Sequence, residues 1–393
     1  MSKKILYREV NGNHFGFVAL LTVFGALVAL GAWAFFSVEH TGHYVTGMDN
    51  QIVWGIPHVF AITLIVAASG ALNIGSIGTV FGKKAYQPLG RLSAVLAIAL
   101  LIGGLAILVL DLGRPDRLII AMTYYNFKSI FAWNIILYNG FIAIVGFYIW
   151  TMMDRRMKGF YKPAGTFAFI WRLILTLGTG SIFGFLVARQ YYDAAIMGPL
   201  FIVMSFAMGL AIFNLVLLAS YSMTGRELGN VIINKLRYLL AVFIGGVVLL
   251  ELARHLTQLY ATEHHGIEAF ILMGDNIYSQ LFWYGFVLVG TVLPLFLIFC
   301  TKLKNSRLAF MGASVMVIAG YVAQIYVILI GGQAYPLQLF PNATVESVYF
   351  DGTVNEYLPS LHEILLGVGG IGIVLLVVAI AVSVLRVLPE SLS

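Results

Sequence analysis

Histidine and carboxylate side chains occur inside or at the ends of long apolar segments, at four positions suited to proton transfer: His58, Asp111, Glu251 and His255. Ionisable groups in such segments are costly, so each is a candidate functional residue. Both side-chain types exchange protons in enzymes. Glu251 and His255 are four residues apart and share a helix face, as either an ion pair or a proton relay. We take all four as candidate catalytic residues, with a structural hydrogen bond as the alternative for His58.

A second set of polar and aromatic residues follows Asp111 closely in the sequence: Arg114, Asn126, Ser129 and Trp133. Arg114 either pairs with Asp111 across a turn or binds a ligand. Trp133 either anchors the protein at the membrane interface, as tryptophan often does, or lines a pocket. With His58 and Asp111, these residues form the candidate ligand-binding set.

The composition identifies the solvent around most of these side chains. Of 393 residues, 60% are hydrophobic and only 10% are charged, whereas soluble domains carry roughly 25% charged residues. A membrane-spanning helix needs about 20 mainly apolar residues. Backbone N–H and C=O groups in lipid must form hydrogen bonds within the protein, and the absence of an alternating strand pattern leaves helices as the spanning structure. The sequence therefore predicts a single all-α polytopic membrane domain with about ten spans, near 15–38, 52–81, 91–111, 129–152, 167–188, 195–220, 236–258, 278–300, 308–332 and 361–385.

The distribution of basic residues supports this number of spans. With ten helices, 18 of the 23 lysines and arginines fall on the side of the two termini and the other 5 on the opposite side. Basic residues concentrate on the cytoplasmic side of membrane proteins. We expect a multi-pass protein of the bacterial inner (cytoplasmic) membrane with both termini in the cytoplasm. The net charge of +6 then reflects topology, not nucleic-acid binding.

Polar residues of the spans gather near the outer ends of the helices, which predicts a pocket there. A quinone (menaquinone or ubiquinone) fits such a pocket, because its carbonyls need hydrogen-bond donors and its redox cycle moves protons. Glu363, at the start of the last span, is expected to act with Glu251 and His255. The single cysteine, Cys300, cannot hold an iron–sulfur cluster or attach a c-type haem, so electrons must pass to another subunit.

Two alternatives to a quinone site remain open. A haem b anchor needs two histidines on facing helices, which His58, His255 and His362 could supply, but the usual spacing is missing and haem is not favoured. A secondary transporter would have broken helices and charges near the midplane. No spacing indicates a metal site, and the loop histidines are expected to be exposed or to face a partner: His40, His43, His264 and His265.

Two runs resemble a known family. Asp111–Pro115 (DLGRP) is similar to the D-x-G-R-P signature of the NrfD/PsrC (polysulfide reductase membrane subunit) family, and Asn126–Trp133 (NFKSIFAW) to its N-x-x-S-x-x-x-W motif. The resemblance is to the ten-helix type. Residues 331–337 and 359–361 are similar to DsrP-like members, found with dissimilatory sulfite reductase electron-transfer complexes.

The resemblance implies two four-helix bundles with flanking helices, and a quinone site in the first bundle near the outer face. His58 is a weaker match than the residues of the two motifs. The implied partner is a periplasmic, ferredoxin-like iron–sulfur subunit, with a c-type cytochrome and further membrane or cytoplasmic subunits as additional candidates. The predicted function is that of a quinone/quinol-interacting membrane subunit of a respiratory or sulfur-metabolism redox complex.

Overall fold

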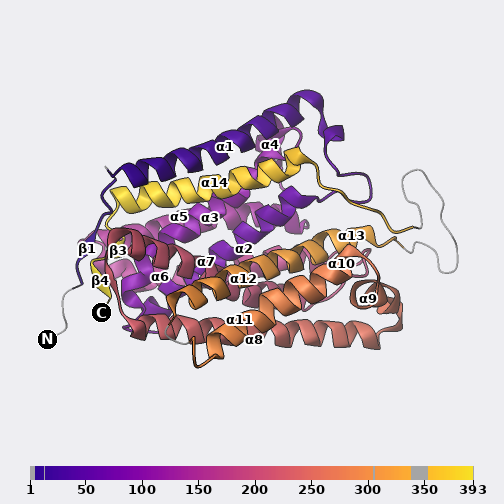
Figure 1. Cartoon of the computed structure of the whole chain (residues 1–393). Helices are drawn as coiled ribbons and strands as arrows, with labels where there is room; N and C mark the ends of the chain where they lie inside the picture. Colours follow the sequence, from indigo (N-terminus) through magenta and orange to yellow (C-terminus); the bar gives the residue numbers. More distant parts are fainter. Residues whose placement is uncertain (1–4, 13, 304–305, 338–352, 393) are drawn as a thin grey trace.

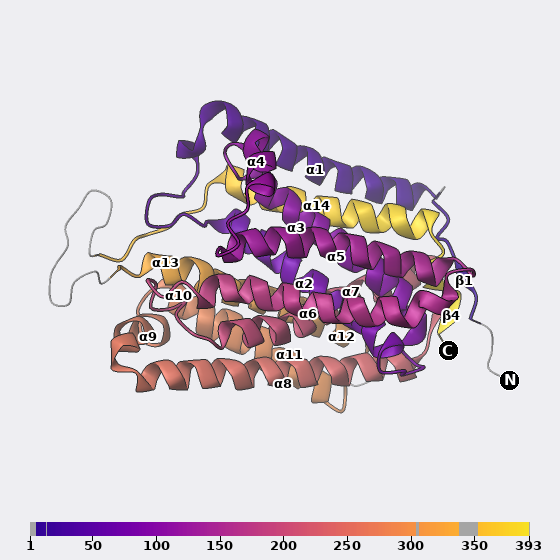
Figure 2. The same cartoon turned by 180° about the vertical axis from the view of Figure 1, so that it is seen from behind.

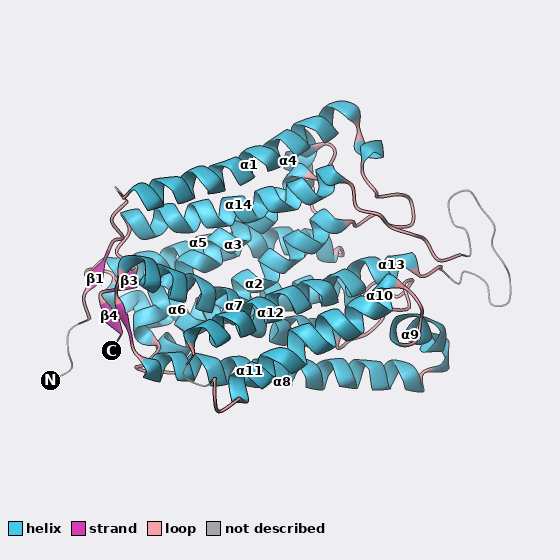
Figure 3. Cartoon of the chain, viewed as in Figure 1, coloured by secondary structure: helices cyan, strands magenta, loops and turns pink. Residues whose placement is uncertain are grey.

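The fold consists of long helices packed side by side, as expected for a protein dissolved in lipid (Figure 3). The computed structural model describes residues 5–12, 14–303, 306–337 and 353–392. Within these residues, ten helices are long and apolar enough to cross a membrane, so the prediction of an all-α polytopic membrane protein is confirmed. Three of the basic residues counted above lie outside the described residues: Lys3, Lys4 and Lys304.

Four consecutive spans form the first bundle: α2 (Ile56–Thr79), α3 (Gly90–Leu110), α5 (Ile130–Met153) and α6 (Tyr161–Gly184). Helix α2 is its centre, with most of its side chains buried. Small residues let backbones approach closely in membrane bundles. A Cβ on Gly70 would lie 1.6 Å from the backbone oxygen of Ser205 on α7, so α2 needs glycine there.

The next four spans form the second bundle. They are α7 (Met197–Thr224), α8 (Asn230–Tyr260), the span α10–η6–α11 (Ile277–Gln280, Leu281–Val292, Leu293–Phe299) and the span α12–η7–α13 (Arg307–Tyr326, Val327–Gly331, Gly332–Ala334). Contacts of α2 with α7 and α12 join the two bundles. Segments η6 and η7 are π-helical. Pro294 follows η6 and lacks the N–H that an α-helical bond would need, which accounts for a change in helical pattern there.

The first span, α1 (Phe15–Thr41), packs on the last span, α14 (Leu361–Val384), which in turn packs on α3 (Figure 1). Near them the two terminal segments meet: β1 (Tyr7–Arg8) pairs antiparallel with β3 (Leu388–Pro389), and β2 (Glu227–Leu228) pairs parallel with β4 (Ser391–Leu392). We call this end of the bundle the terminal face and the opposite end the distal face.

Short helices complete the connections. They are η1 (His43–Val45), η2 (Gln87–Leu89), η3 (Pro115–Arg117), α4 (Leu118–Thr123), η4 (Lys158–Phe160), η5 (Thr262–His264) and α9 (His265–Leu272). In the view from behind, α4 and α9 both lie toward the distal face (Figure 2). Helix α8 begins six residues before the span that hydropathy predicts, because its first two turns contain the polar residues Asn230, Asn234 and Lys235, which a helix can place at the headgroups.

Candidate functional site

The first polar cluster at the distal face contains His43, His58, Asp111 and Glu363, and we call it the Asp111 cluster. Asp111 ends α3, His58 lies in the first turn of α2, and His43 lies in η1. The Oδ2 atom of Asp111 is 3.3 Å from His58 Nδ1, and its Oδ1 atom is 3.9 Å from His43 Nε2. His43 Nε2 is also 3.2 Å from the Asp111 backbone oxygen. Two candidate catalytic residues thus lie together, with a histidine on each side of one carboxyl group.

The Asp111 cluster is not satisfied by its own hydrogen bonds. His58 Nδ1 and Asp111 Oδ2 are within hydrogen-bond distance but not in alignment, and both are buried without a partner among the described residues. Buried polar groups are normally paired, so such atoms call for a missing partner. Burial, and secondarily the nearby Glu363 carboxylate, raises the pKa of Asp111 to about 7. This carboxyl group can therefore exchange a proton near neutral pH.

Glu363 belongs to the Asp111 cluster. The expectation that it acts together with Glu251 and His255 is therefore wrong. Glu363 Oε1 accepts from the Tyr357 hydroxyl at 2.6 Å, and its Oε2 accepts from the Gly47 and Ser360 backbone N–H groups, both at 2.7 Å. The Ser360 side chain returns a capping-box bond to the start of α14. Tyr357 also accepts from the N–H of Ile56, which fixes the turn that presents His58.

An aromatic wall stands beside the start of α2. The indole of Trp54 contacts three rings from other elements of the first bundle and its exit turn, with centroid distances of 6.0 Å to Phe131, 5.9 Å to Phe183 and 6.4 Å to Tyr192. Gln333 fixes this segment, because its Oε1 accepts from the N–H of Trp54 at 3.1 Å and its Nε2 donates to the Trp54 oxygen at 3.0 Å. Such flat apolar surfaces suit contact with a planar ring.

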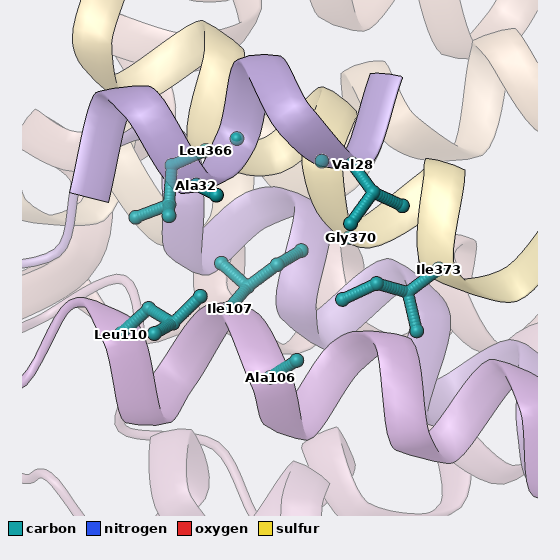
Figure 4. A pocket seen from close by; sticks show the side chains of 10 residues that line it. Val28, Ala32, Ala106, Ile107, Leu110, Leu366, Gly370 and Ile373 are labelled. Atoms are coloured by element: carbon teal, nitrogen blue, oxygen red, sulfur yellow. The ribbon is translucent and has the colours of Figure 1, made fainter. Parts of the chain in front are cut away.

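A small apolar cavity of about 70 Å³ lies between α1, α3 and α14 (Figure 4). It begins beside Leu110, which immediately precedes Asp111, and Leu366, one turn after Glu363. Val28 and Ile373 line it further along the helices. The cavity therefore lies near the Asp111 cluster and extends between the flanking spans and α3.

The motif residues after Asp111 build an exposed loop. Arg114 does not pair with Asp111, because it forms a bidentate ion pair with Asp116 whose two side chains are largely exposed. Asn126 accepts from the Lys128 N–H at 3.1 Å, and the Trp133 indole donates to the Phe127 oxygen at 2.9 Å.

Ser129 precedes α5 without capping it through its side chain. Among the described contacts, none joins Arg114, Asn126, Ser129 or Trp133 to His58 or Asp111. Gly113 in the same motif has a φ of 70°, which favours glycine, and a Cβ there would approach the His43 ring to 3.2 Å.

A second polar cluster, the Arg254 cluster, lies in the second bundle and contains Glu251, Arg254, His255 and Glu268. Arg254 Nε donates to Glu251 Oε2 at 2.9 Å, and His255 Nδ1 is 2.6 Å from Glu268 Oε2. Glu251 and His255 do share a helix face, but 3.8 Å separates their nearest atoms, and each has a closer partner. No described contact links this cluster to His58 or Asp111, so the four candidate catalytic residues form two separate sites.

Three residues in or next to these clusters were not expected from the sequence. His43 and His264 were expected to be exposed or to face a partner, yet His43 contacts Asp111 and His264 is buried. Glu268 lies in a short connecting helix, where only its place in an apolar segment could have drawn attention to it. The three histidines considered for haem have different contacts, since His362 approaches Ser37 at 3.1 Å and stacks on Trp33.

Fold and site together define a multi-pass helical membrane protein with an incompletely bonded histidine–carboxyl pair at one face. The family model described as polysulphide reductase, NrfD matches residues 44–336, and the protein belongs to this family.

Named relatives match almost the whole sequence. It is 27% identical to the Hdr-like menaquinol oxidoreductase integral membrane subunit of Archaeoglobus fulgidus, over 98% of this protein and 97% of that one. It is also 27% identical to a selenate reductase subunit of Mesobacillus selenatarsenatis, over 93% of each. A polysulfide reductase subunit of Wolinella succinogenes is 23% identical, over 73% of this protein and 96% of the relative.

Proposed function

We propose that this protein is the quinone-reactive membrane subunit of a respiratory or sulfur-metabolism oxidoreductase complex. The observation that carries the proposal is the buried His58–Asp111 pair, whose facing atoms have no hydrogen-bond partner among the described residues. A quinone carbonyl or quinol hydroxyl that approaches the His58–Asp111 pair from one side would supply the missing partner. The names of the relatives support this choice, since one is a menaquinol oxidoreductase membrane subunit.

The pair can carry out the proton part of quinol oxidation. When a quinol loses two electrons, its two O–H bonds break, and Asp111 as carboxylate and His58 as neutral imidazole can each take one proton. His43 contacts Asp111 and is 39% exposed, so it offers a path for these protons to water at the distal face. The reverse sequence would deliver two protons to a quinone that accepts two electrons.

The substrate would reach this site from the lipid. Its ring would lie against the aromatic wall around Trp54. The first atoms of its hydrocarbon tail would enter the small apolar cavity beside Leu110 and Leu366, and the rest of the tail would stay in the lipid (Figure 4). Menaquinone and ubiquinone share this chemistry, and the names of the relatives favour menaquinone.

The two electrons must pass to or from another subunit, because one cysteine cannot hold a cluster. We place an iron–sulfur partner over the distal face, which in this scheme is the periplasmic side, with both termini in the cytoplasm. The exposed loop with Arg114 and Trp133 lies next to α3 and offers this partner an ion pair and aromatic rings. In this arrangement the family motif serves docking, while His58 and Asp111 serve chemistry.

The test is quinol-driven reduction of the partner in the purified complex, measured by stopped-flow spectroscopy. Asp111→Asn and His58→Gln keep side-chain size and remove the proton acceptor, so both should abolish most of the turnover. The controls are Glu227→Gln, an exposed carboxylate at the terminal face, and His40→Gln, whose ring contacts Phe36 of its own helix. Normal turnover in an assembled Asp111→Asn complex would contradict the site, and a partner indifferent to any quinol would contradict the function.

A further inference from the structure

The Arg254 cluster places four ionisable side chains almost out of contact with solvent. Side-chain exposure is 0% for Arg254 and Glu268, 4% for Glu251 and 9% for His255. Burying charges this deeply costs several kcal/mol per ion unless they balance one another. Such groups inside a membrane bundle are functional candidates by default.

The contacts around His255 are compatible with two protonation states. Its Nε2 atom is 3.2 Å from Arg254 Nη2, which can only donate, and 3.8 Å from Glu251 Oε2, which can only accept when ionised. A singly protonated ring, with its proton on Nδ1 toward Glu268, accepts from Arg254. A doubly protonated ring instead directs Nε2–H at Glu251. Both states therefore have partners already in place.

Charge counting favours the exchange of one proton. Arg254 is positive and the two glutamates are negative, so the cluster is neutral when the His255 ring is doubly protonated and carries one negative charge when it is not. We propose that the Arg254 cluster is a one-proton site, which takes up and releases a proton at the His255–Glu268 contact. This site is separate from the Asp111 cluster and does not require that the quinone function be correct.

A route for the proton leads to the distal face. Glu268 Oε1 and His264 Nδ1 are both buried without a hydrogen-bond partner among the described residues. These residues are four apart, one turn along η5 and α9, so a water molecule can bridge them. His264 Nε2 is 3.6 Å from Glu263, whose side chain is 76% exposed. Glu268, His264 and Glu263 thus connect the site to water.

In the opposite direction, the two helices that carry Glu251 and Gln324 have no ionisable relay. Between Tyr238 and Glu251, helix α8 carries only apolar residues, and α12 carries no ionisable side chain between Arg307 and Tyr321. The cluster ends on this side at Gln324, whose Nε2 donates to Glu251 at 2.5 Å, and at the buried Tyr321 hydroxyl. We therefore assign exchange with the distal face alone, as in a proton store and not in a transmembrane channel.

The groups facing His255 from each packed element define what can shift its protonation. The ionisable groups are Glu251 and Arg254 on α8, Glu268 and His264 in the η5–α9 segment, Tyr191 before α7, and Tyr321 on α12. Helix η6 contributes the uncharged ring of Phe282. Tyr191 accepts from Arg254 at 2.7 Å, and the next residue, Tyr192, stacks on Trp54 of the first bundle. Tyr191 and Tyr192 therefore connect the Arg254 cluster to the aromatic wall through adjacent residues of the same turn.

The test is nuclear magnetic resonance of the full-length protein in lipid nanodiscs with isotope-labelled histidine, which separates singly from doubly protonated rings. The His255 signal, assigned by its loss in His255→Gln, should show both forms as the pH of the sample is changed across the range in which the protein stays folded. Glu268→Gln removes the balancing charge, so the ratio of doubly to singly protonated ring at one fixed pH should fall about tenfold or more. Glu251→Gln should act in the same direction and serves if Glu268→Gln does not fold.

The exit route has its own readout. Glu263→Gln and His264→Gln should slow proton exchange at His255 while leaving the ratio of its two forms nearly unchanged. A His255 ring that stays in one form across the whole range would overturn the proton site and leave an ion pair. Unchanged exchange in both exit variants would overturn the route through Glu268. Neither result bears on quinol oxidation at the Asp111 cluster.

Discussion

The Asp111 cluster and the Arg254 cluster both place histidine and carboxylate groups near the distal face, but they differ in how completely these groups are paired. Asp111 and His58 face each other with atoms that lack hydrogen-bond partners among the described residues. In the Arg254 cluster, the guanidinium, the imidazole and both carboxylates each have a charged or polar partner within 2.9 Å. The first bundle therefore contains a pair whose facing atoms both lack a partner. In the second bundle every ionisable group of the cluster has a partner, and Glu268 Oε1 is the one atom of its four side chains left without one among the described residues.

The physical cost explains why this difference is informative. An unpaired buried polar group costs about 1–3 kcal/mol of folding free energy, so such a group calls for an explanation. A ligand that supplies the missing partner recovers that cost. In the Arg254 cluster the ionisable groups already have partners, so a ligand would add little stabilisation. What such a cluster can exchange is a proton.

The largest expected effect is on folding, from a change in the Arg254 cluster. Arg254→Leu leaves the buried carboxylates of Glu251 and Glu268 without their cation, and breaking a buried ion pair in this way typically costs about 3–5 kcal/mol. We expect a sharp loss of assembled protein, measured by membrane yield and thermal unfolding in detergent. Arg114→Leu, on an exposed pair, should leave both unchanged, and equal losses in the two variants would remove the contrast between the clusters.

The next effect is on activity without a loss of stability. Asp111→Asn removes a buried carboxylate that has no cation beside it, so unfolding temperature should hold or rise slightly. Quinol turnover should fall by about a hundredfold or more, as is usual when a general base is lost. A variant that loses stability and turnover together would indicate that the Asp111 cluster is as structural as the Arg254 cluster.

The pH dependence of turnover follows from the raised pKa of Asp111, about 7. Quinol oxidation needs the carboxylate, whose fraction rises roughly tenfold per pH unit below the pKa and levels off above it. Turnover should therefore increase from acidic pH to about neutral and then reach a plateau. Steady-state rates across this range check the prediction, and a profile flat below neutral pH would show that Asp111 does not accept the proton.

The smallest effect concerns Glu363. Its charge contributes to the raised pKa of Asp111 after burial itself. Glu363→Gln keeps an acceptor for Tyr357 but removes that charge, so the acidic limb of the pH profile should move to lower pH while the plateau changes little. A limb that moves to higher pH would mean that Glu363 acts on Asp111 in some way other than charge repulsion.

Several features of the fold could be read from the sequence because they depend on local composition. Apolar segments long enough to cross a bilayer appear as hydropathy, and the loop motif of residues 111–133 indicated the family. Asp111 and His58 could be singled out because ionisable residues are rare in such segments. The exposed positions of Arg114 and Trp133 could not be read, since the motif gives residue types and not the direction of side chains.

The sequence by itself determined that lipid is the solvent, that the protein folds as helices, and which few polar residues are candidates for function. Only the tertiary structure decided how these residues group. His43 meets Asp111 across 68 residues of sequence, and Glu363 meets Gly47 across 316, which took Glu363 out of the group with Glu251 and His255. Helical periodicity extends over a few turns and carries no information on such distances. The packing of α14 against α3, and of α9 against α8, decided which of these residues meet. It placed the four candidate catalytic residues in two separate clusters.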